Sequence, residues 1–478
     1  LKTPAHKIRR IISIALWFSI SLAATLLLYS QQTTSLAYSA NYRFTPASWS
    51  TDNQIPSKIG ALLEQGRLLK DWDFGEWQIS DRPPLMGGAM ALPAWLANII
   101  WESNDNLSAL PFIFNTFGIC LLALWIFPIW EWLRLRKTRT TLRILSLIVL
   151  SASPFLFFNM VYIWPKLLSA TLALLGWLLI ASPGLCRSRS AEAILAGIAI
   201  GLSLMSHGGA FFGLSAMAMV LLATQSTSRW KYYILAGLCS LVIITPWIAW
   251  VKSYAPPGNA LTKLAFAGST GISDPSKSVT STIIEAYRNE TLAHWIHKKE
   301  QAVRSLAGLH QPISQHTMWP QEGNRVRFFQ FFHIIPSIGI LLLCLPTVAL
   351  SPKKTIHTWG TKPSTVLLVS LVGIALQILI MWDHHVVHHY SYSTLLLLHF
   401  FLVMCLLQSP TQYIRFVAIA TMTFFGYFWI IDPIISFNKL SLTISGAVAL
   451  IYALGLYFVA RADINGRHDQ KARPVTHR

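Results

Sequence analysis

The chain has 478 residues, of which 53% are hydrophobic and only 12% are charged, and its formal net charge is +19. Soluble domains usually contain about 25% charged residues, so this composition excludes an ordinary soluble protein. A basic chain can bind nucleic acid, but here many of the bases lie in short connectors, and no basic stripe interleaves with aromatic residues outside the apolar runs. We therefore expect membrane lipids and no nucleic acid as partners.

Apolar runs long enough to cross a bilayer recur along the whole chain. They predict an all-α polytopic membrane protein with about 12 transmembrane helices. The predicted spans are residues 11–30, 109–132, 142–161, 167–184, 191–206, 210–225, 231–251, 328–349, 364–382, 391–408, 413–431 and 440–460. Lys and Arg gather in alternate connectors and in the tail, which predicts that both termini are cytoplasmic.

Two long loops are expected outside the membrane and divide the chain into six parts. These are the first helix (1–30), an external catalytic loop (31–108), helices two to seven (109–251), a second external loop (252–327), helices eight to twelve (328–460) and a basic cytoplasmic tail (461–478). In the first loop we expect a short helix from Pro56 to Leu69 and an apolar surface helix from Leu85 to Trp101.

Asp52 lies beyond the end of the first span, in a loop that is rich in acids for this chain. Asp is a good N-cap, so it could simply begin the helix expected near Pro56. An acid next to an apolar surface is also typical of a general base. Position alone leaves both interpretations open.

The segment from Ser80 to Leu85 reads Ser-Asp-Arg-Pro-Pro-Leu. Its two prolines restrict the backbone and hold Asp81 and Arg82 just before the apolar helix. The two residues could form an ordinary surface ion pair, which contributes little. Alternatively, the planar guanidinium of Arg82 could bind phosphate oxygens next to the lipid.

Together, these features resemble the first external loop of GT-C glycosyltransferases, with the closest pattern in the protein O-mannosyltransferase and lipid A aminoarabinose transferase group. The shared order is an Asp after the first helix, a helix, a link that contains Gly66, and the turn Asp81-Arg82-Pro83-Pro84-Leu85. That group usually has Asp-Glu at the first acid and Lys after the second, where this chain has Asn53 and Arg82.

The resemblance implies a GT-C-like bundle that transfers a sugar from a polyprenyl-phosphate donor to a saccharide, lipid or protein acceptor outside the membrane. Asp52 is then the candidate base, and Asp81 the second catalytic candidate, since Asp81 or Asp73 could compensate for the acid missing at position 53. A single obvious base predicts inversion at the anomeric carbon.

Arg82 is the first candidate for the donor phosphate, followed by Lys166 and His207. Lys166 follows Trp164-Pro165 at the outer junction of two spans, where it could instead be an interface anchor. His207 precedes Gly208-Gly209 at a tight outer turn, where it could instead be a polar cap.

A histidine cluster at the outer end of a span and two residues of the second loop are candidates for substrate contact: His384, His385, His388 and His389, with Tyr287 and Arg288. The spacing of His384 and His388 places both on one helical face, which is also what a metal site requires. A divalent metal is therefore an alternative to a polar rim, although His suits zinc better than magnesium or manganese. We expect no other cofactor.

Two alternatives to a monosaccharide transferase remain. A transporter or flippase of lipid-linked saccharide would show a pseudo-repeat and ionisable residues within the membrane, and neither is evident. A ligase or polymerase that uses a polyprenyl-diphosphate glycan fits the sequence nearly as well. In either transferase case we expect a multi-pass protein of the bacterial inner membrane with its active site on the extracytoplasmic face.

Overall fold

The structure is a computed structural model, and it describes residues 4–29, 52–67, 79–100, 110–182, 184–224, 229–254, 259–268, 274, 276–309, 333–346, 362–382, 384 and 392–426. Every regular element in these ranges is a helix, which confirms the predicted all-α class. Within the same ranges, five helices are long and apolar enough to cross a membrane, or six when one bent pair counts as a single span.

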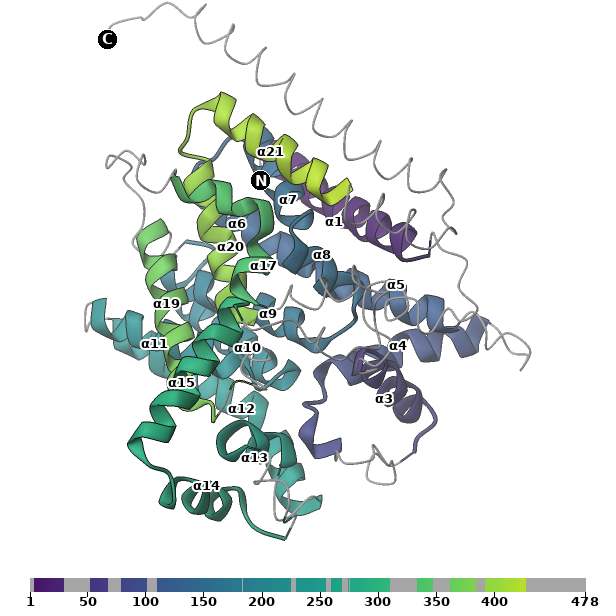
Figure 1. Ribbon diagram of the computed structural model, residues 1–478. Helices are drawn as coiled ribbons and strands as arrows, with labels where there is room; N and C mark the ends of the chain where they lie inside the picture. The colour runs from purple at the N-terminus through teal and green to yellow at the C-terminus, as the bar shows by residue number, and fades with distance from the viewer. Residues whose placement is uncertain are drawn as a thin grey trace, which may run out of the picture.

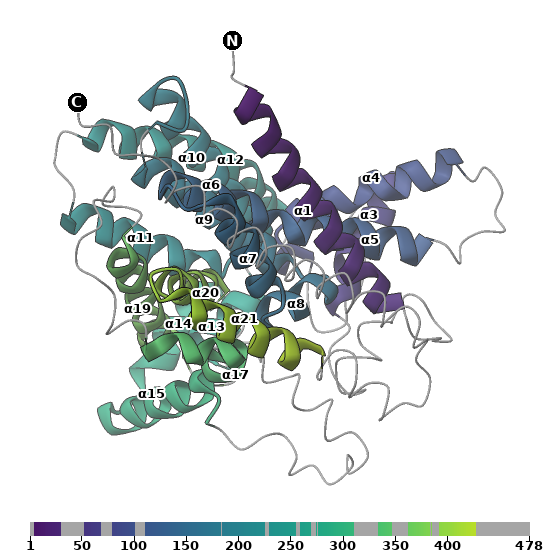
Figure 2. The same ribbon diagram turned by 90° about the horizontal axis from the view of Figure 1, so that it is seen from above.

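The apolar helices form one bundle (Figure 1). It consists of α1 (Pro4–Tyr29), α5 (Leu110–Leu122), α6 (Ile126–Leu135), α7 (Thr140–Ser151), α8 (Pro154–Val161), α9 (Pro165–Ala181), α10 (Arg189–Ser206), α11 (Ala210–Thr224), α12 (Trp230–Tyr254), α17 (Ile334–Ile338), α19 (Pro363–Ile380), α20 (Tyr392–Leu406) and α21 (Thr411–Gly426). Seen from above, α1 and α5 lie on one side, and α10, α11, α12 and α19 lie on the other (Figure 2). The central helices α9 and α20 are almost entirely buried.

Most of the predicted spans overlap described helices, but of the predicted span 328–349 the structure describes residues 333–346, which form the short α17 and a 3-10 segment over residues 339–344. Residues 440–460 lie outside the described part of the chain. The predicted span 142–161 is broken: α7 and α8 meet at an angle of 68°. The cause is local, because Ser153 caps α8 and Pro154 occupies its first turn, where no amide hydrogen is needed. The predicted split between α10 and α11 is confirmed at His207–Gly209.

The first of the two loops that the sequence predicts to be external is built around two helices packed against each other, α3 (Ile55–Glu64) and α4 (Leu85–Ile100). A methyl group added at Gly60 would collide with the backbone of Met90, and one added at Gly87 would collide with Ile59. The two glycines therefore allow the helix axes to approach closely. Helix α3 ends earlier than predicted, before Gly66, whose φ of +65° suits the absence of a side chain.

Helix α4 has one buried face and one exposed apolar face. Met86 and Met90 are buried, whereas Leu92, Trp95, Leu96 and Ile99 are exposed at helical spacing. This pattern is what the sequence predicts for an amphipathic helix that lies at the membrane surface.

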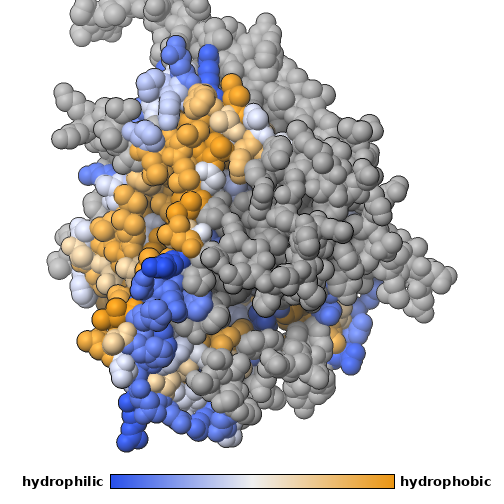
Figure 3. Space-filling model, viewed as in Figure 1, coloured by the Kyte–Doolittle hydropathy of each residue, from blue (hydrophilic) through white to orange (hydrophobic). Residues whose placement is uncertain are grey.

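The second loop that the sequence predicts to be external contains α13 (Ala260–Ala267), α14 (Val279–Arg288) and α15 (Leu292–Ala307). On the face shown in Figure 3, hydrophilic residues lie over α14 and α15 at the bottom, and hydrophobic residues lie above them. Trp382 joins this loop to the end of α19, since Lys298 Nζ lies 3.6 Å from its ring centre and the Tyr287 ring meets it edge-on.

Candidate functional site

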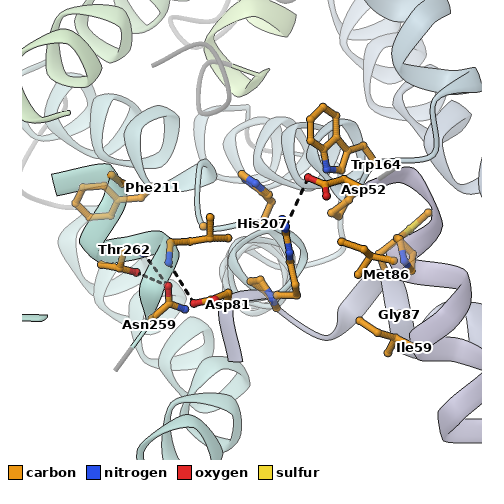
Figure 4. Close-up of a pocket in the computed structure, with 18 of the residues that line it drawn as sticks. Asp52, Ile59, Asp81, Met86, Gly87, Trp164, His207, Phe211, Asn259 and Thr262 are labelled. Carbon is orange, nitrogen blue, oxygen red and sulfur yellow. Dashed lines mark hydrogen bonds and ion pairs between the residues drawn. The ribbon is translucent and has the colours of Figure 1, made fainter. Parts of the chain in front are cut away.

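A cavity of about 430 Å³ lies where the first external loop meets the ends of the bundle helices (Figure 4). We call it the polar cavity, and it is lined by Asp52, Ile55, Pro56, Ile59, Asp81, Arg82, Pro83, Met86, Gly87, Trp164, Pro165, His207, Gly208, Phe211, Phe212, Asn259, Leu261, Thr262, Ala265 and Phe266. The basic connectors after α6, α9 and α11 join the opposite ends of these helices. The cavity thus brings together four segments that the sequence predicts to lie on the same side of the membrane. They are the first loop, the turn before α9, the turn before α11, and the segment that contains residues 259–266.

Asp52 and Arg82 form an ion pair across the polar cavity. The Asp52 carboxylate lies 3.5 Å from an Arg82 terminal nitrogen, and the side chains are 25% and 16% exposed. Nε of Arg82 is buried and makes no hydrogen bond to any described residue. A guanidinium has five N–H donors, so Arg82 can contact Asp52 and still offer donors to an anionic ligand.

Asp81 points away from this pair, toward α13 (Figure 4). Its carboxylate accepts a hydrogen bond from the Leu261 amide at 3.2 Å, and the residue is buried. Asn259 donates to the Ser80 carbonyl at 2.9 Å and caps α13 through the Thr262 amide. Asp81 and Arg82, which are neighbours in one turn, therefore face two different parts of the cavity.

Lys166 does not line the polar cavity. Its ammonium lies 3.3 Å from the centre of the Trp164 ring and 5.3 Å from that of Tyr392, and the residue is buried. Trp164 and Pro165 are the residues of this segment that line the cavity. The Lys166 amine thus lies behind an aromatic ring, in contact with its face.

His207 lines the polar cavity with its tautomer fixed by the backbone. Its Nδ1 accepts the Gly209 amide hydrogen at 3.0 Å, so in the neutral ring Nε2 carries the proton. Burial lowers the pKa of His207 well below its usual value, and the charges of Lys166 and Arg82 act in the same direction. The result is a neutral imidazole whose Nε2 carries the hydrogen.

The sequence analysis assigned no role to several residues of the cavity lining, among them Trp164, Phe211 and Asn259. Tyr162 is not part of that lining, but its phenol is near enough to Asp52 to feel its charge. Burial raises the pKa of the Tyr162 phenol well above its usual value, and the negative charge of Asp52 adds to this effect. Asn259 could have been found, because Asn that follows Pro-Pro-Gly and precedes an apolar run is a typical N-cap. No local signal distinguishes Trp164 or Phe211 from packing residues.

The remaining residues that the sequence analysis proposed for substrate contact are Tyr287, Arg288 and the histidine cluster. Tyr287 and Arg288 are exposed on α14 and do not line the polar cavity. The His384 carbonyl accepts a hydrogen bond from Ser305, whereas residues 385, 388 and 389 lie outside the described part of the chain. Among the described residues, no group of three or more His, Cys, Asp or Glu side chains is arranged to hold a metal ion.

A second cavity of about 320 Å³ adjoins the first. We call it the apolar cavity, and it is lined by Trp177, Ile180, Ile200, Leu204, Phe211, Leu214, Ser215, Met217, Ala218, Leu221, Leu222, Tyr233, Ala236 and Gly237. These residues belong to α9, α10, α11 and α12. Phe211 lines both cavities, so the two lie next to each other.

The chain has the helical membrane fold of GT-C glycosyltransferases, which confirms the resemblance found in the sequence. It is similar to the lipid A aminoarabinose transferase ArnT from Cupriavidus metallidurans in the apo state, with a TM-score of 0.52, 10% identity, and coverage of 95% of this chain and 76% of that one. The same enzyme bound to undecaprenyl phosphate gives a TM-score of 0.50 at 10% identity, with 96% and 76% covered.

The oligosaccharyltransferase of Archaeoglobus fulgidus in its apo form also matches, with a TM-score of 0.44, 13% identity, and coverage of 94% of this chain and 55% of that one. No protein-family profile and no curated protein matches the chain. The similarity is therefore one of fold.

Proposed function

We propose that the chain is an integral-membrane glycosyltransferase that moves a sugar from a polyprenyl-phosphate donor to an extracytoplasmic acceptor, with inversion at the anomeric carbon. The observation that carries the proposal is the Asp52–Arg82 pair in the polar cavity, where a carboxylate and a guanidinium meet beside an apolar groove. The shared fold adds support, since ArnT is seen with undecaprenyl phosphate.

Asp52 is the proposed general base. The acceptor hydroxyl attacks the anomeric carbon, the bond from that carbon to the phosphate oxygen breaks, and the hydroxyl proton passes to Asp52. A carboxylate within hydrogen-bond reach contributes a factor of about 10²–10⁴ to such a step. Trp164 lies beside Asp52 in the cavity (Figure 4), and aromatic rings commonly stack on sugar rings.

Arg82 is the proposed ligand of the donor phosphate. Its buried Nε without a partner among the described residues is a donor that a phosphate oxygen would satisfy. The phosphate gains negative charge as the sugar leaves, so a fixed guanidinium stabilises the transition state more than the ground state. His207 would add a neutral N–H donor. Lys166 would act only through its contact with the Trp164 ring.

The apolar cavity is the proposed place for the first part of the prenyl chain. It is lined almost entirely by hydrocarbon and joins the polar cavity at Phe211. A donor whose phosphate lies near Arg82 could therefore extend past Phe211 between the bundle helices. The exposed apolar face of α4 offers a second route to the lipid.

The active site is placed outside the cytoplasm on charge grounds. The basic connectors join the helix ends opposite the polar cavity, and Lys and Arg prefer the cytoplasmic side. An acceptor could then be a saccharide, lipid or protein of the cell envelope.

The proposal is tested by separating binding from turnover. Asp52→Asn is expected to bind polyprenyl phosphate like the wild type while its transfer rate falls by about 10²–10⁴. Arg82→Ala is expected to lose lipid binding by about tenfold or more, because charged hydrogen bonds contribute about 1.5–3 kcal/mol. Native mass spectrometry measures the bound lipid, and release of polyprenyl phosphate from a synthetic donor in proteoliposomes measures turnover.

Arg134→Ala is the matched control, since it removes an arginine at the opposite end of the bundle. An Asp52→Asn protein with full transfer activity would overturn the assignment of the base. Copurification of a diphosphate-linked glycan would favour the ligase alternative, and transport without bond cleavage would favour a flippase.

A further inference from the structure

We propose that Asp81 is a positioning residue, which holds α13 in place as a wall of the polar cavity and takes no part in proton transfer. The proposal rests on the proposed function, because it concerns how that same site is assembled. It assigns the two acids of the first loop different tasks, with the base at Asp52 and a structural link at Asp81.

The first observation is the hydrogen bond between Asp81 and α13. Leu261 is the second residue of this helix, and its amide has no acceptor within the helix. The buried carboxylate of Asp81 accepts that hydrogen at 3.2 Å across 180 positions of sequence. A negative charge is also favourable here, because the N-terminus of a helix carries positive partial charge.

A second link runs beside the first. Asn259 donates to the Ser80 carbonyl at 2.9 Å, while its own side-chain oxygen accepts the Thr262 amide at 2.8 Å. The turn at Ser80–Asp81 therefore contacts α13 through one side-chain acceptor and one backbone acceptor. Both contacts lie at the same end of the helix.

The opposite end of α13 is held by a different part of the chain. The Trp382 amide donates to the Ala265 carbonyl at 2.9 Å, and the Trp382 ring lies against Gly268, whose φ is +74°. Because the helix has only eight residues, loss of the Asp81 contact would leave its N-terminal end linked to the Ser80–Asp81 turn mainly by the Asn259 hydrogen bond. The N-terminal end of α13 could then move away from the first loop.

Such a movement would open the polar cavity. Leu261, Thr262, Ala265 and Phe266 of α13 line it together with the first-loop residues Ile59 and Met86. The distance across the cavity therefore depends on the link at Asp81. We expect its loss to weaken substrate binding more than it slows the chemical step.

The decisive comparison is Asp81→Asn against Asp81→Ala. Asn keeps a side-chain oxygen for the Leu261 amide but cannot take up a proton as a base. A positioning residue predicts that Asp81→Asn stays within about threefold of the wild type, and that Asp81→Ala raises the donor KM by about tenfold with a smaller change in kcat. Equal inactivity of both variants, with KM unchanged, would overturn the proposal.

Hydrogen exchange gives a readout that needs no activity. In the full-length protein in nanodiscs, the amides of residues 261–264 are expected to exchange faster in Asp81→Ala than in Asp81→Asn or the wild type. Glu285→Ala, which removes an exposed acid on α14, is the control and should leave this exchange unchanged. Unchanged exchange in Asp81→Ala contradicts the proposal.

The two proposals fail in different ways. If the protein transfers no sugar from any polyprenyl-phosphate donor, the proposed function fails, yet the exchange experiment still tests the link at Asp81. If Asp81→Ala does not fold, Asn259→Ala removes the neighbouring link and is expected to give the same faster exchange. Exchange at the wild-type rate in Asn259→Ala would then overturn the proposal.

Discussion

The polar and apolar cavities meet at Phe211 but differ in what lines them. The polar cavity contains Asp52, Asp81, Arg82 and His207, whereas the polar groups lining the apolar cavity are limited to Ser215 and Tyr233. A ligand that fills both must have a charged or polar head and a hydrocarbon tail. The difference thus supports the proposed lipid-linked donor.

The two cavities also differ in how they are built. The polar cavity joins segments that are far apart in sequence, including α3, α4, α13 and the turns before α9 and α11. The apolar cavity lies between four helices that follow one another along the chain. We expect changes in the first to affect chemistry and substrate binding together, and changes in the second to affect the lipid tail alone.

The largest expected effects come from filling each cavity separately. Gly208 lines the polar cavity and Gly237 the apolar one, and an added methyl group at either position meets no atom within 4 Å. Gly208→Leu should lower kcat/KM by at least about tenfold for donors of any chain length. Gly237→Leu should do so only for long-chain donors, since each buried methylene contributes about 0.8 kcal/mol.

The measurement is kcat/KM across a series of synthetic donors from short to long prenyl chains. Gly426→Leu on α21 is the control, because it adds the same side chain in open space away from both cavities. If Gly237→Leu shows the chain-length dependence of the wild type, the prenyl chain lies elsewhere, and the exposed face of α4 becomes the better candidate.

A second prediction concerns the stability of the polar cavity's wall. Gly87 and Gly88 are neighbours in α4, but a methyl group at Gly87 would collide with Ile59, whereas one at Gly88 meets nothing within 4 Å. Gly87→Ala should destabilise the protein by about 1–3 kcal/mol through overpacking. Gly88→Ala should stabilise it by up to about 1 kcal/mol, because Ala favours helix more than Gly.

Thermal unfolding in detergent, followed by tryptophan fluorescence, compares the two variants with the wild type. Gly60→Ala should be at least as damaging as Gly87→Ala, because the obstacle at Gly60 is the backbone of Met90 and cannot rotate away. Equal melting temperatures for all three variants would show that α3 and α4 can separate without cost.

Local patterns in the sequence were sufficient to predict most helices. The apolar runs gave the bundle, and the glycines after His207 gave the turn between α10 and α11. The break at Ser153–Pro154 was not predicted. Within a long apolar run, the only local signals of the new helix are the Ser153 cap and Pro154 in the first turn. Hydrophobicity alone does not report where a span bends.

The candidate site was predicted less completely. Asp52, Asp81, Arg82 and His207 were named from residue type and position, and all four line the polar cavity. The partners were not predictable, because the Asp81–Leu261 contact joins residues 180 positions apart and arises only from packing. Lys166 illustrates the same limit, since its place behind Trp164 depends on the start of α9 and on Tyr392.

The smallest expected effect is a pH dependence of stability from His207. Its pKa is lowered in the folded protein by burial and by the charges of Lys166 and Arg82. The unfolded chain therefore binds a proton below about pH 6.5 that the folded chain refuses, so stability is full above that pH and falls as the pH drops. In His207→Asn the side-chain oxygen can still accept the Gly209 amide hydrogen, but this titration is gone.

Lowering the pH from about 7.5 to about 5.5 should thus reduce the melting temperature of the wild type more than that of His207→Asn. The comparison with the variant cancels the titration of other groups, which both proteins share. In the proposed binding mode, a neutral His207 would donate one hydrogen bond to a phosphate, and Arg82 is the cation that lines the described part of the polar cavity. A wild type that gains stability on acidification relative to His207→Asn would mean that the folded protein holds His207 charged, contrary to this prediction.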